Sequence, residues 1–376
     1  MMTISNDPWH FPRTELAKQI LGMFETGLAS SLTFFAPRRM GKTEFLRKDI
    51  TPLAEQLGWR VFYFSFLDAG LHSEGQFVKA LDEFSKQNGL MGKATHWIKN
   101  IGSLSTEVAG VKAEVTLLQG QVNSSILSSI TKLAQQGKPI LLLLDEIQAL
   151  ASSKYKTTIA SLRTALDMHK ETIKVVFTGS SREGLRQMFS VSSAPFFHYG
   201  QNLPFPNLTK AFTDHLADVF NQTTGRSLNK EILWHAFLDM KQSPQLARSL
   251  VERLALNPML AIDFAKEQLI ADTMGHRDFS GLWGEFKLLE QLILKAIAES
   301  QVELYSSQFR QHLADSIGVD NIAVSSIQSA LRSLSKKQII FKPENGTYEI
   351  EDALFKEWIM DCLLYTSDAA DDMQCV

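Results

Sequence analysis

The feature that most constrains the fold is a short loop between an apolar run and a helical pattern. Residues 32–35 read LTFF, residues 36–43 read APRRMGKT, and residues 44–47 read EFLR. A strand that turns through Gly-Lys-Thr into a helix is typical of a P-loop, in which backbone N–H groups and a lysine surround phosphate oxygens. Ala36 stands where this spacing usually has its first glycine. Alanine is compatible with that position as long as its φ is negative.

The loop predicts the residues that bind a nucleotide. Gly41 allows close backbone approach, Lys42 supplies an ammonium, and the Thr43 hydroxyl is a ligand for Mg²⁺. The whole predicted nucleotide-binding segment consists of Pro37, Arg38, Arg39, Met40, Gly41, Lys42, Thr43 and Glu44. A Gly-Lys-Thr triplet also arises by chance, so the prediction depends on a second motif.

That second motif lies further along the chain, where the apolar run 140–144 leads directly into Asp145 and Glu146. The first carboxylate is expected at Mg²⁺, and the second beside the γ-phosphate, where it polarises water. Ligands of open parallel sheets bind beyond the carboxyl ends of the strands, so the two motifs predict one site. We expect ATP and Mg²⁺ as cofactors, Lys42 and Glu146 as catalytic residues, and Thr43 with Asp145 as metal ligands.

A third polar cluster follows another apolar run, at residues 178–181 (TGSS). Its hydroxyls would reach the same sheet edge, where they could contact the γ-phosphate or the attacking water. Thr178 and Ser180 are therefore predicted as further catalytic residues. The alternative is an ordinary strand-to-turn junction rich in small polar residues.

Strands and helices are predicted to alternate over residues 1–206, which is typical of a parallel sheet covered on both faces. Strands are expected at residues 32–35, 60–66, 140–144 and 173–178, with a weaker fifth at 196–199. Near-continuous apolar runs such as 140–144 indicate strands buried on both faces. Residues 90–122 are interpreted as an insertion that alternates like a short hairpin.

The pattern changes after residue 206. Helices are expected at residues 208–225, 229–240, 244–256 and 259–275, which we interpret as an all-helical lid over 207–280. Within 281–361, helices are expected at 286–299, 307–317 and 325–335, followed by short alternating runs at 338–342 and 347–350. This is the order of a winged helix. The predicted fold class is α/β, with a P-loop core, a helical lid and a winged-helix domain.

In this order, the motifs resemble those of the archaeal-type ATPase family, P-loop proteins related to AAA+ and STAND ATPases. The resemblance covers residues 10–361 and rests on Phe11, Arg13 and Glu15, on PRRMGKTEFL, LLLLDEIQAL and FTGSSRE, and on the closing YEIEDALFKEWI. It implies a core ATPase domain, a helical lid and a winged helix. It also implies that Thr178 or Ser180 senses the γ-phosphate, and that Arg248 is a lid arginine reaching the nucleotide. A solvated helix arginine is the alternative for Arg248.

The composition of the chain limits which partners and which compartment we expect for it. The net charge of −3 gives no general attraction to nucleic acid or to an acidic membrane surface. No apolar run approaches a membrane span, so a soluble cytoplasmic protein is expected. The two cysteines, Cys362 and Cys375, offer no disulfide framework to the rest of the chain. Residues 362–371 (CLLYTSDAAD) resemble a translated transposon-end sequencing adapter. Our hypothesis is that residues 362–376 are an assembly artefact, and we set them apart as non-structural.

The sequence of the winged-helix segment does not decide whether its partner is DNA or a protein. Residues 283–361 carry eight Lys or Arg against twelve Asp or Glu, which opposes binding to a phosphate backbone. The stretch from Ser325 to Lys342 carries four basic residues and no acid, so it could contact DNA. Reuse of the winged helix as a protein-interaction module is equally compatible with the sequence.

Three functions fit these observations. The leading one is an ATP-hydrolysing switch that relays its nucleotide state to the winged helix. The second is a non-catalytic DNA-binding regulator for which nucleotide is only a conformational ligand. The third is a STAND-type signalling or defence scaffold that self-assembles with ATP. Glu146 separates the first two, because only hydrolysis needs a residue that activates water.

Overall fold

The core of the protein is a five-stranded parallel sheet with the strand order β2-β3-β4-β1-β5. The computed structural model describes residues 7–69, 73–86, 125–192, 194–276, 279–300, 303–342 and 347–367. The strands are β1 (Ser31–Phe35), β2 (Arg60–Ser65), β3 (Ile140–Asp145), β4 (Ile173–Gly179) and β5 (Gln201–Pro204). The predicted α/β fold and four of its strands are confirmed. The insertion predicted at 90–122 lies outside the described residues.

The fifth strand was predicted wrongly. Residues 196–198 lie in a turn and residue 199 has no regular structure, and β5 lies just beyond them, paired with β1. The rings of Phe196 and Tyr199 are buried because they pack against Phe177 on one face of the sheet, not because their backbone pairs in it. The β5 side chains are mostly exposed at the sheet edge, so this strand lacks the apolar pattern that marks the others.

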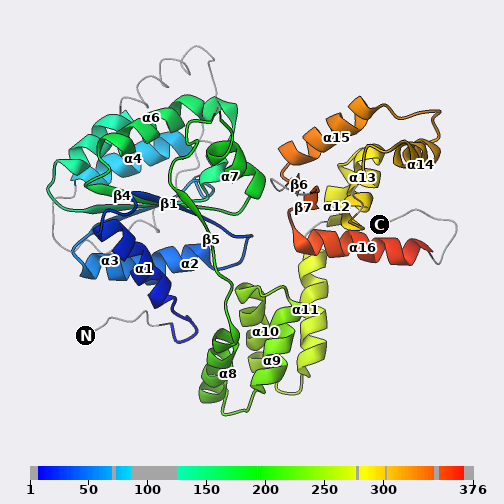
Figure 1. Ribbon diagram of the computed structural model, residues 1–376. Coiled ribbons are helices and arrows are strands. Elements are labelled where there is room, and N and C mark those ends of the chain that lie inside the picture. The colour runs from blue at the N-terminus through cyan, green and yellow to red at the C-terminus, as the bar shows by residue number, and fades with distance from the viewer. Residues whose placement is uncertain are drawn as a thin grey trace, which may run out of the picture.

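Helices cover both faces of this sheet (Figure 1). On one face lie α1 (Thr14–Glu25) and a continuous helical stretch made of α2 (Lys42–Glu44), a π-helical segment (Phe45–Ile50) and α3 (Thr51–Gln56). On the other face lie α4 (Ser73–Lys86), the helix over 125–134, α6 (Lys156–Met168) and α7 (Arg182–Phe189). The sheet is thus buried on both sides, as the apolar runs predicted.

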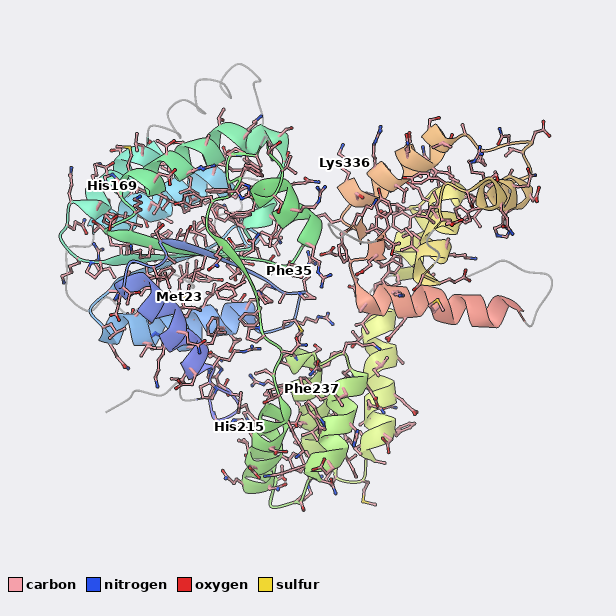
Figure 2. The ribbon with its side chains drawn as sticks, viewed as in Figure 1. Met23, Phe35, His169, His215, Phe237 and Lys336 are labelled. Carbon is pink, nitrogen blue, oxygen red and sulfur yellow. The ribbon has the colours of Figure 1, made fainter. Side chains whose placement is uncertain are left out.

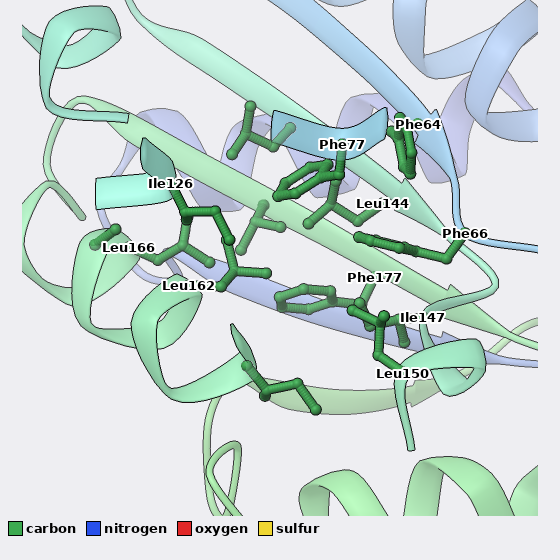
Figure 3. Packing of buried hydrophobic residues seen from close by; sticks show 14 of the residues in the cluster. Phe64, Phe66, Phe77, Ile126, Leu144, Ile147, Leu150, Leu162, Leu166 and Phe177 are labelled. Carbon is green, nitrogen blue, oxygen red and sulfur yellow. The ribbon is translucent and has the colours of Figure 1, made fainter. Parts of the chain in front are cut away.

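Alternate residues of β3 pack into different halves of the core. Ile140, Leu142 and Leu144 join the cluster under α4 and α6, part of which Figure 3 shows. Leu141 and Leu143 join the cluster under α1 and α3. Because successive side chains of a strand point to opposite faces, burial on both sides requires an unbroken apolar run.

Four helices after β5 pack around a core cluster of their own. They are α8 (Lys210–Thr224), α9 (Lys230–Asp239), α10 (Pro244–Leu256) and α11 (Ile262–His276). Each begins within three residues of its predicted start. Caps explain several of these starts: Asn229 accepts from the backbone of Glu231 and Ile232, and Ser243 accepts from that of Leu246.

The remaining elements form the winged helix around a separate cluster. They are α12 (Phe279–Gly284), α13 (Leu288–Ala298), α14 (Ser307–Ile317), α15 (Val324–Lys336), β6 (Ile340–Phe341), β7 (Glu349–Ile350) and α16 (Ala353–Ser367). The two short strands pair antiparallel as the hairpin, or wing. Helix α12 was not predicted, and α16 continues into the segment that was set apart as non-structural. None of the helices formed by the described residues has the length and apolar character needed to cross a membrane.

Candidate functional site

Three hydroxyl groups converge on Asp145, the last residue of β3. Thr43 Oγ1, in the first turn after the loop, donates to Asp145 Oδ2 at 2.6 Å. The Tyr63 hydroxyl of β2 donates to the same oxygen at 3.0 Å, and Thr178 Oγ1 of β4 donates to Oδ1. Asp145 is only 1% exposed. The carboxylate is therefore held in one orientation by side chains from both neighbouring strands and from the loop.

Lys42 is buried beside this carboxylate. Its ammonium donates to the backbone oxygens of Ala36 at 2.6 Å and Pro37 at 3.0 Å. The Nζ also lies 3.9 Å from Glu146 Oε1. Burial lowers the pKa of Lys42, while the carboxylates of Glu146 and Asp145 oppose that shift. The site thus pairs one buried cation with two acids.

The loop has a backbone geometry that its sequence explains in part. Ala36 is buried and keeps a negative φ, so alanine replaces the usual glycine without strain. Gly41 has a φ of 85°, and an added Cβ would meet no atom within 4 Å, so its positive φ is the reason for glycine there. Arg39 also has a positive φ, 69°. Non-glycine residues in this region are uncommon and cluster at functional sites.

Glu146 directly follows β3 and has a φ of 54°. Its Oε2 accepts a hydrogen bond from Ser180 Oγ at 2.6 Å and another from Gln148 Nε2. Gln148 is buried and also donates to Ser180 Oγ at 3.2 Å. The second acid of the site is therefore held by residues at the ends of β3 and β4.

Arg13 anchors the loop from the N-terminal side. Its guanidinium donates to the backbone oxygens of Met40 at 3.3 Å and of Pro206. It also lies over the ring of Phe205, 4.3 Å from the centroid. Burial lowers the pKa of Arg13 to about 10, and the charge of Asp49 opposes this shift. Arg13 therefore joins the loop to the segment that leaves the sheet for α8.

Arg248 of α10 lies in a line of charges near the start of the core. It pairs with Asp7 Oδ2 at 3.5 Å, and Lys48 pairs with the same oxygen at 3.0 Å. Lys48 also forms an ion pair with Glu44, one turn before it on the helix after the loop. These ion pairs link α10 to the helical stretch that follows the loop. A direct contact of Arg248 or Glu44 with nucleotide stays a prediction.

The structure brings Lys42, Thr43, Asp145, Thr178 and Ser180 together with Glu146. Pro37 and Arg38 lie exposed on the loop. Sequence reasoning missed Tyr63 and Gln148. A tyrosine that interrupts the phenylalanines of residues 62–66 (FYFSF) is the only local signal for the first. Gln148 follows Glu146 by two residues on a turn. Nothing in this spacing indicates that the Gln148 side chain bonds back to Glu146.

Comparison with known proteins places this geometry in a family. A family model described as "ATPase domain predominantly from Archaea" matches residues 11–236. The chain belongs to this family. A second model, described as "Probable winged helix domain", matches residues 278–361. Membership in this archaeal-type ATPase family agrees with the resemblance that the motifs indicated. A search of curated proteins found no match.

Solved structures share the fold across almost the whole chain. A Walker-type ATPase of Pyrococcus abyssi is 16% identical with a TM-score of 0.61, over 94% of this chain and 100% of that one. The ORC2 protein of Aeropyrum pernix in its ADP form is 15% identical with a TM-score of 0.54, over 95% of this chain and 94% of that one. At these identities the likeness concerns the fold. This archaeal-type ATPase therefore has the AAA+-like core, helical region and winged helix that its sequence predicted.

Proposed function

We propose that the protein binds ATP at the carboxyl edge of its sheet and hydrolyses it to ADP and phosphate with Mg²⁺. The observation that carries the proposal is the 3.9 Å approach of Glu146 to Lys42, beside the linked pair Thr43 and Asp145. A buried ammonium, a pair of oxygen ligands and a carboxylate that orients water are the groups that phosphoryl transfer to water requires. Membership in an ATPase family supports the choice of nucleotide.

The oxygen atoms at Asp145 fit a magnesium ion. Thr43 Oγ1 and Asp145 Oδ2 lie 2.6 Å apart, and both are hard donors of the kind that Mg²⁺ prefers. Thr43 and Asp145 would hold the ion, which when bound neutralises charge on the phosphates. The further hydrogen bonds from Tyr63 and Thr178 orient the carboxylate for this role.

Lys42 and the loop backbone bind the phosphates in this proposal. The ammonium exchanges its bonds with the backbone oxygens of Ala36 and Pro37 for bonds with phosphate oxygens. The backbone N–H groups from Gly41 to Glu44 begin a continuous helical stretch, whose positive end favours an anion. Burial disfavours the charged form of Lys42, and a phosphate anion would restore it.

Glu146 activates the attacking water. Its carboxylate takes the proton of the water as the water oxygen bonds to the γ-phosphorus and the bond to the ADP oxygen breaks. Ser180 and Gln148 hold this carboxylate. Ser180 and Thr178 therefore act on the reaction by positioning Glu146 and Asp145, and they are suited to sense the γ-phosphate.

The winged helix contacts DNA in the second part of this proposal. The exposed residues of α15 include Ser325, Gln328, Ser329, Arg332 and Lys336. Figure 2 marks Lys336 at the end of α15. Residues 324–342 contain no acid, so this face can approach a phosphate backbone despite the negative charge of the domain. A protein partner would be indicated if DNA fails to bind.

The test of the catalytic proposal is ATP hydrolysis by the unmutated protein and by Glu146→Gln. The substitution should lower the rate by about 10²- to 10⁴-fold while ATP still binds, because the amide keeps the shape but cannot take the proton. Glu171→Gln, on an exposed turn of the core, is the matched control. A background rate in the unmutated protein, with and without DNA, would favour the non-catalytic regulator. ATP-dependent growth in size on gel filtration would favour the scaffold.

A further inference from the structure

The wing of the winged helix lies against the start of α7 in the core (Figure 1). The backbone N–H of Arg182, the first residue of α7, donates to Glu351 Oε1 at 2.7 Å. Its guanidinium lies 3.8 Å from Glu349 Oε2. The same guanidinium lies 4.6 Å from the ring centroid of Phe341 in β6 and 4.9 Å from that of Phe35 in β1. One arginine therefore contacts both strands of the wing and the strand that leads into the loop.

The negative charges of the wing suit contact with Arg182 and the start of α7. Glu349 and Glu351 present two carboxylates to a guanidinium and to the positive end of α7. An exposed ion pair by itself adds little stability, so the contact depends on the carboxylates acting together with the cation–π contacts. Two carboxylates on the wing repel the phosphate backbone of DNA. The basic surface of this domain lies on α15 instead, which leaves the wing available for the core.

Arg182 is also tied to the proposed catalytic residues. It follows Ser180 by two positions, and Ser180 Oγ donates to Glu146. Ser180 and Ser181 are buried, and α7 packs tightly on the turn after β3. A Cβ added to Gly184 would lie 2.7 Å from Gln148 Cβ, so there is no slack between α7 and that turn. A shift of Glu146 and Gln148 must therefore move the start of α7.

We propose that the wing is a docking element for Arg182, and that this contact couples the nucleotide site to the position of the winged helix. The coupling rests on the proposed function, whereas the docking does not. Glu146 is bound to Ser180 and Gln148 in the docked geometry. With ATP bound, Ser180 senses the γ-phosphate by donating to it instead of to Glu146, which Gln148 still holds, and the loss of the Ser180 bond frees the start of α7 to move. ATP therefore favours release of the wing, and ADP favours docking.

Docking is tested by small-angle X-ray scattering of the full chain without nucleotide. Arg182→Glu places a like charge opposite Glu349 and should raise the radius of gyration. The double variant Arg182→Glu/Glu349→Arg restores the pair and should return the scattering toward that of the unmutated protein. Lys156→Glu makes the same change of charge at an exposed position of α6 and should leave it unchanged. Scattering of Arg182→Glu that matches the unmutated protein would overturn the docking proposal.

A second variant distinguishes loss of the contact from misfolding of Arg182→Glu. Glu349→Lys/Glu351→Lys removes the contact from the wing and must produce the same expansion, with an unchanged circular dichroism spectrum. A folded wing variant that stays compact would overturn the proposal in the same way.

Coupling is tested on the unmutated protein with Mg²⁺ and either ADP or a hydrolysis-resistant ATP analogue. The analogue should expand the protein, ADP should not, and Arg182→Glu should respond to neither. Binding of both nucleotides is measured separately by calorimetry. Binding of the analogue without expansion overturns the coupling alone. Absence of binding overturns both the coupling and the proposed function, whereas docking is still decided by the nucleotide-free experiment.

Discussion

Thr43 Oγ1 lies 2.6 Å from Asp145 Oδ2, although 102 residues separate the two in sequence. The contact arises because β1, which leads into the loop of Thr43, and β3, which ends in Asp145, flank β4 in one parallel sheet and end at the same edge. Thr178 of β4 bonds the other oxygen of the carboxylate. Parallel pairing thus gathers the proposed metal ligands without any local sequence signal linking them.

Thr43→Ala should weaken ATP binding by about 10-fold when Mg²⁺ is present, because one ligand of the ion is lost. In the presence of a chelator the two proteins should bind ATP almost equally. Thr43→Ser keeps the hydroxyl and should behave like the unmutated protein. Titration calorimetry measures both conditions, and equal affinities in Mg²⁺ would remove Thr43 from the metal site.

Lys42→Met should lower ATP affinity by about 10- to 100-fold, because a charge-assisted bond to phosphate is lost. The thermal midpoint without nucleotide should also fall, because the buried carboxylate of Asp145 and that of Glu146 lose their cation and two loop carbonyls lose their donor. Lys18→Met, at an exposed pair with Glu15 on α1, is the control for removing a lysine. Unchanged ATP affinity in Lys42→Met would remove Lys42 from the phosphate-binding residues.

Tyr63→Phe should reduce the loss of stability at alkaline pH. Burial, and then the charge of Asp145, raise the pKa of Tyr63 above its usual value near 10. The folded state therefore keeps a proton that the unfolded state loses, so this contribution is complete below about pH 10 and declines above it. Urea unfolding from about pH 9 to about pH 11 measures the slope. Tyr199, whose pKa burial also raises, is present in both proteins and leaves a residual decline. Equal slopes in the two proteins would contradict the prediction.

Phe177→Ala should lower the free energy of unfolding by about 3 to 5 kcal/mol, because it leaves a cavity in the centre of the sheet. Phe177 is fully buried and its ring contacts Phe189, Phe196 and Tyr199. Leu28→Ala, at a side chain that is 77% exposed, should stay within about 0.5 kcal/mol of the unmutated protein. Urea denaturation compares the three proteins. A loss below that of a typical surface substitution would show that the cluster repacks around the missing ring.

Arg332→Ala and Lys336→Ala should each weaken DNA binding and reduce the slope of log affinity against log salt by about 1. Lys156→Ala, on α6 of the core, should leave the slope unchanged. Fluorescence anisotropy over a salt series measures the three variants. Equal slopes for all of them would exclude α15 as the DNA-contacting surface and would direct attention to a protein partner.

Much of the fold was predictable because its signals are local. The apolar runs at 32–35 and 140–144, and the caps and breaks of the helices after residue 206, mark elements within a few residues of where they lie. β5 was missed because an exposed edge strand has no apolar pattern, and the buried rings of Phe196 and Tyr199 imitated one. Burial can come from packing against a sheet as well as from pairing within it.

The sequence by itself determined which residue types stand at the candidate site, and from them we predicted its chemistry. Residue type and spacing alone identify the loop with Gly41, Lys42 and Thr43. They also identify the two acids, Asp145 and Glu146, that follow the run 140–144. Only the tertiary structure decided which residues support them. Tyr63 reaches Asp145, Gln148 turns back to Glu146, and Arg182 meets Glu351 across 169 residues of chain. The reason is physical: phosphate and metal chemistry constrains contiguous residues, whereas a supporting contact needs only a nearby donor, which any strand of the folded chain can supply.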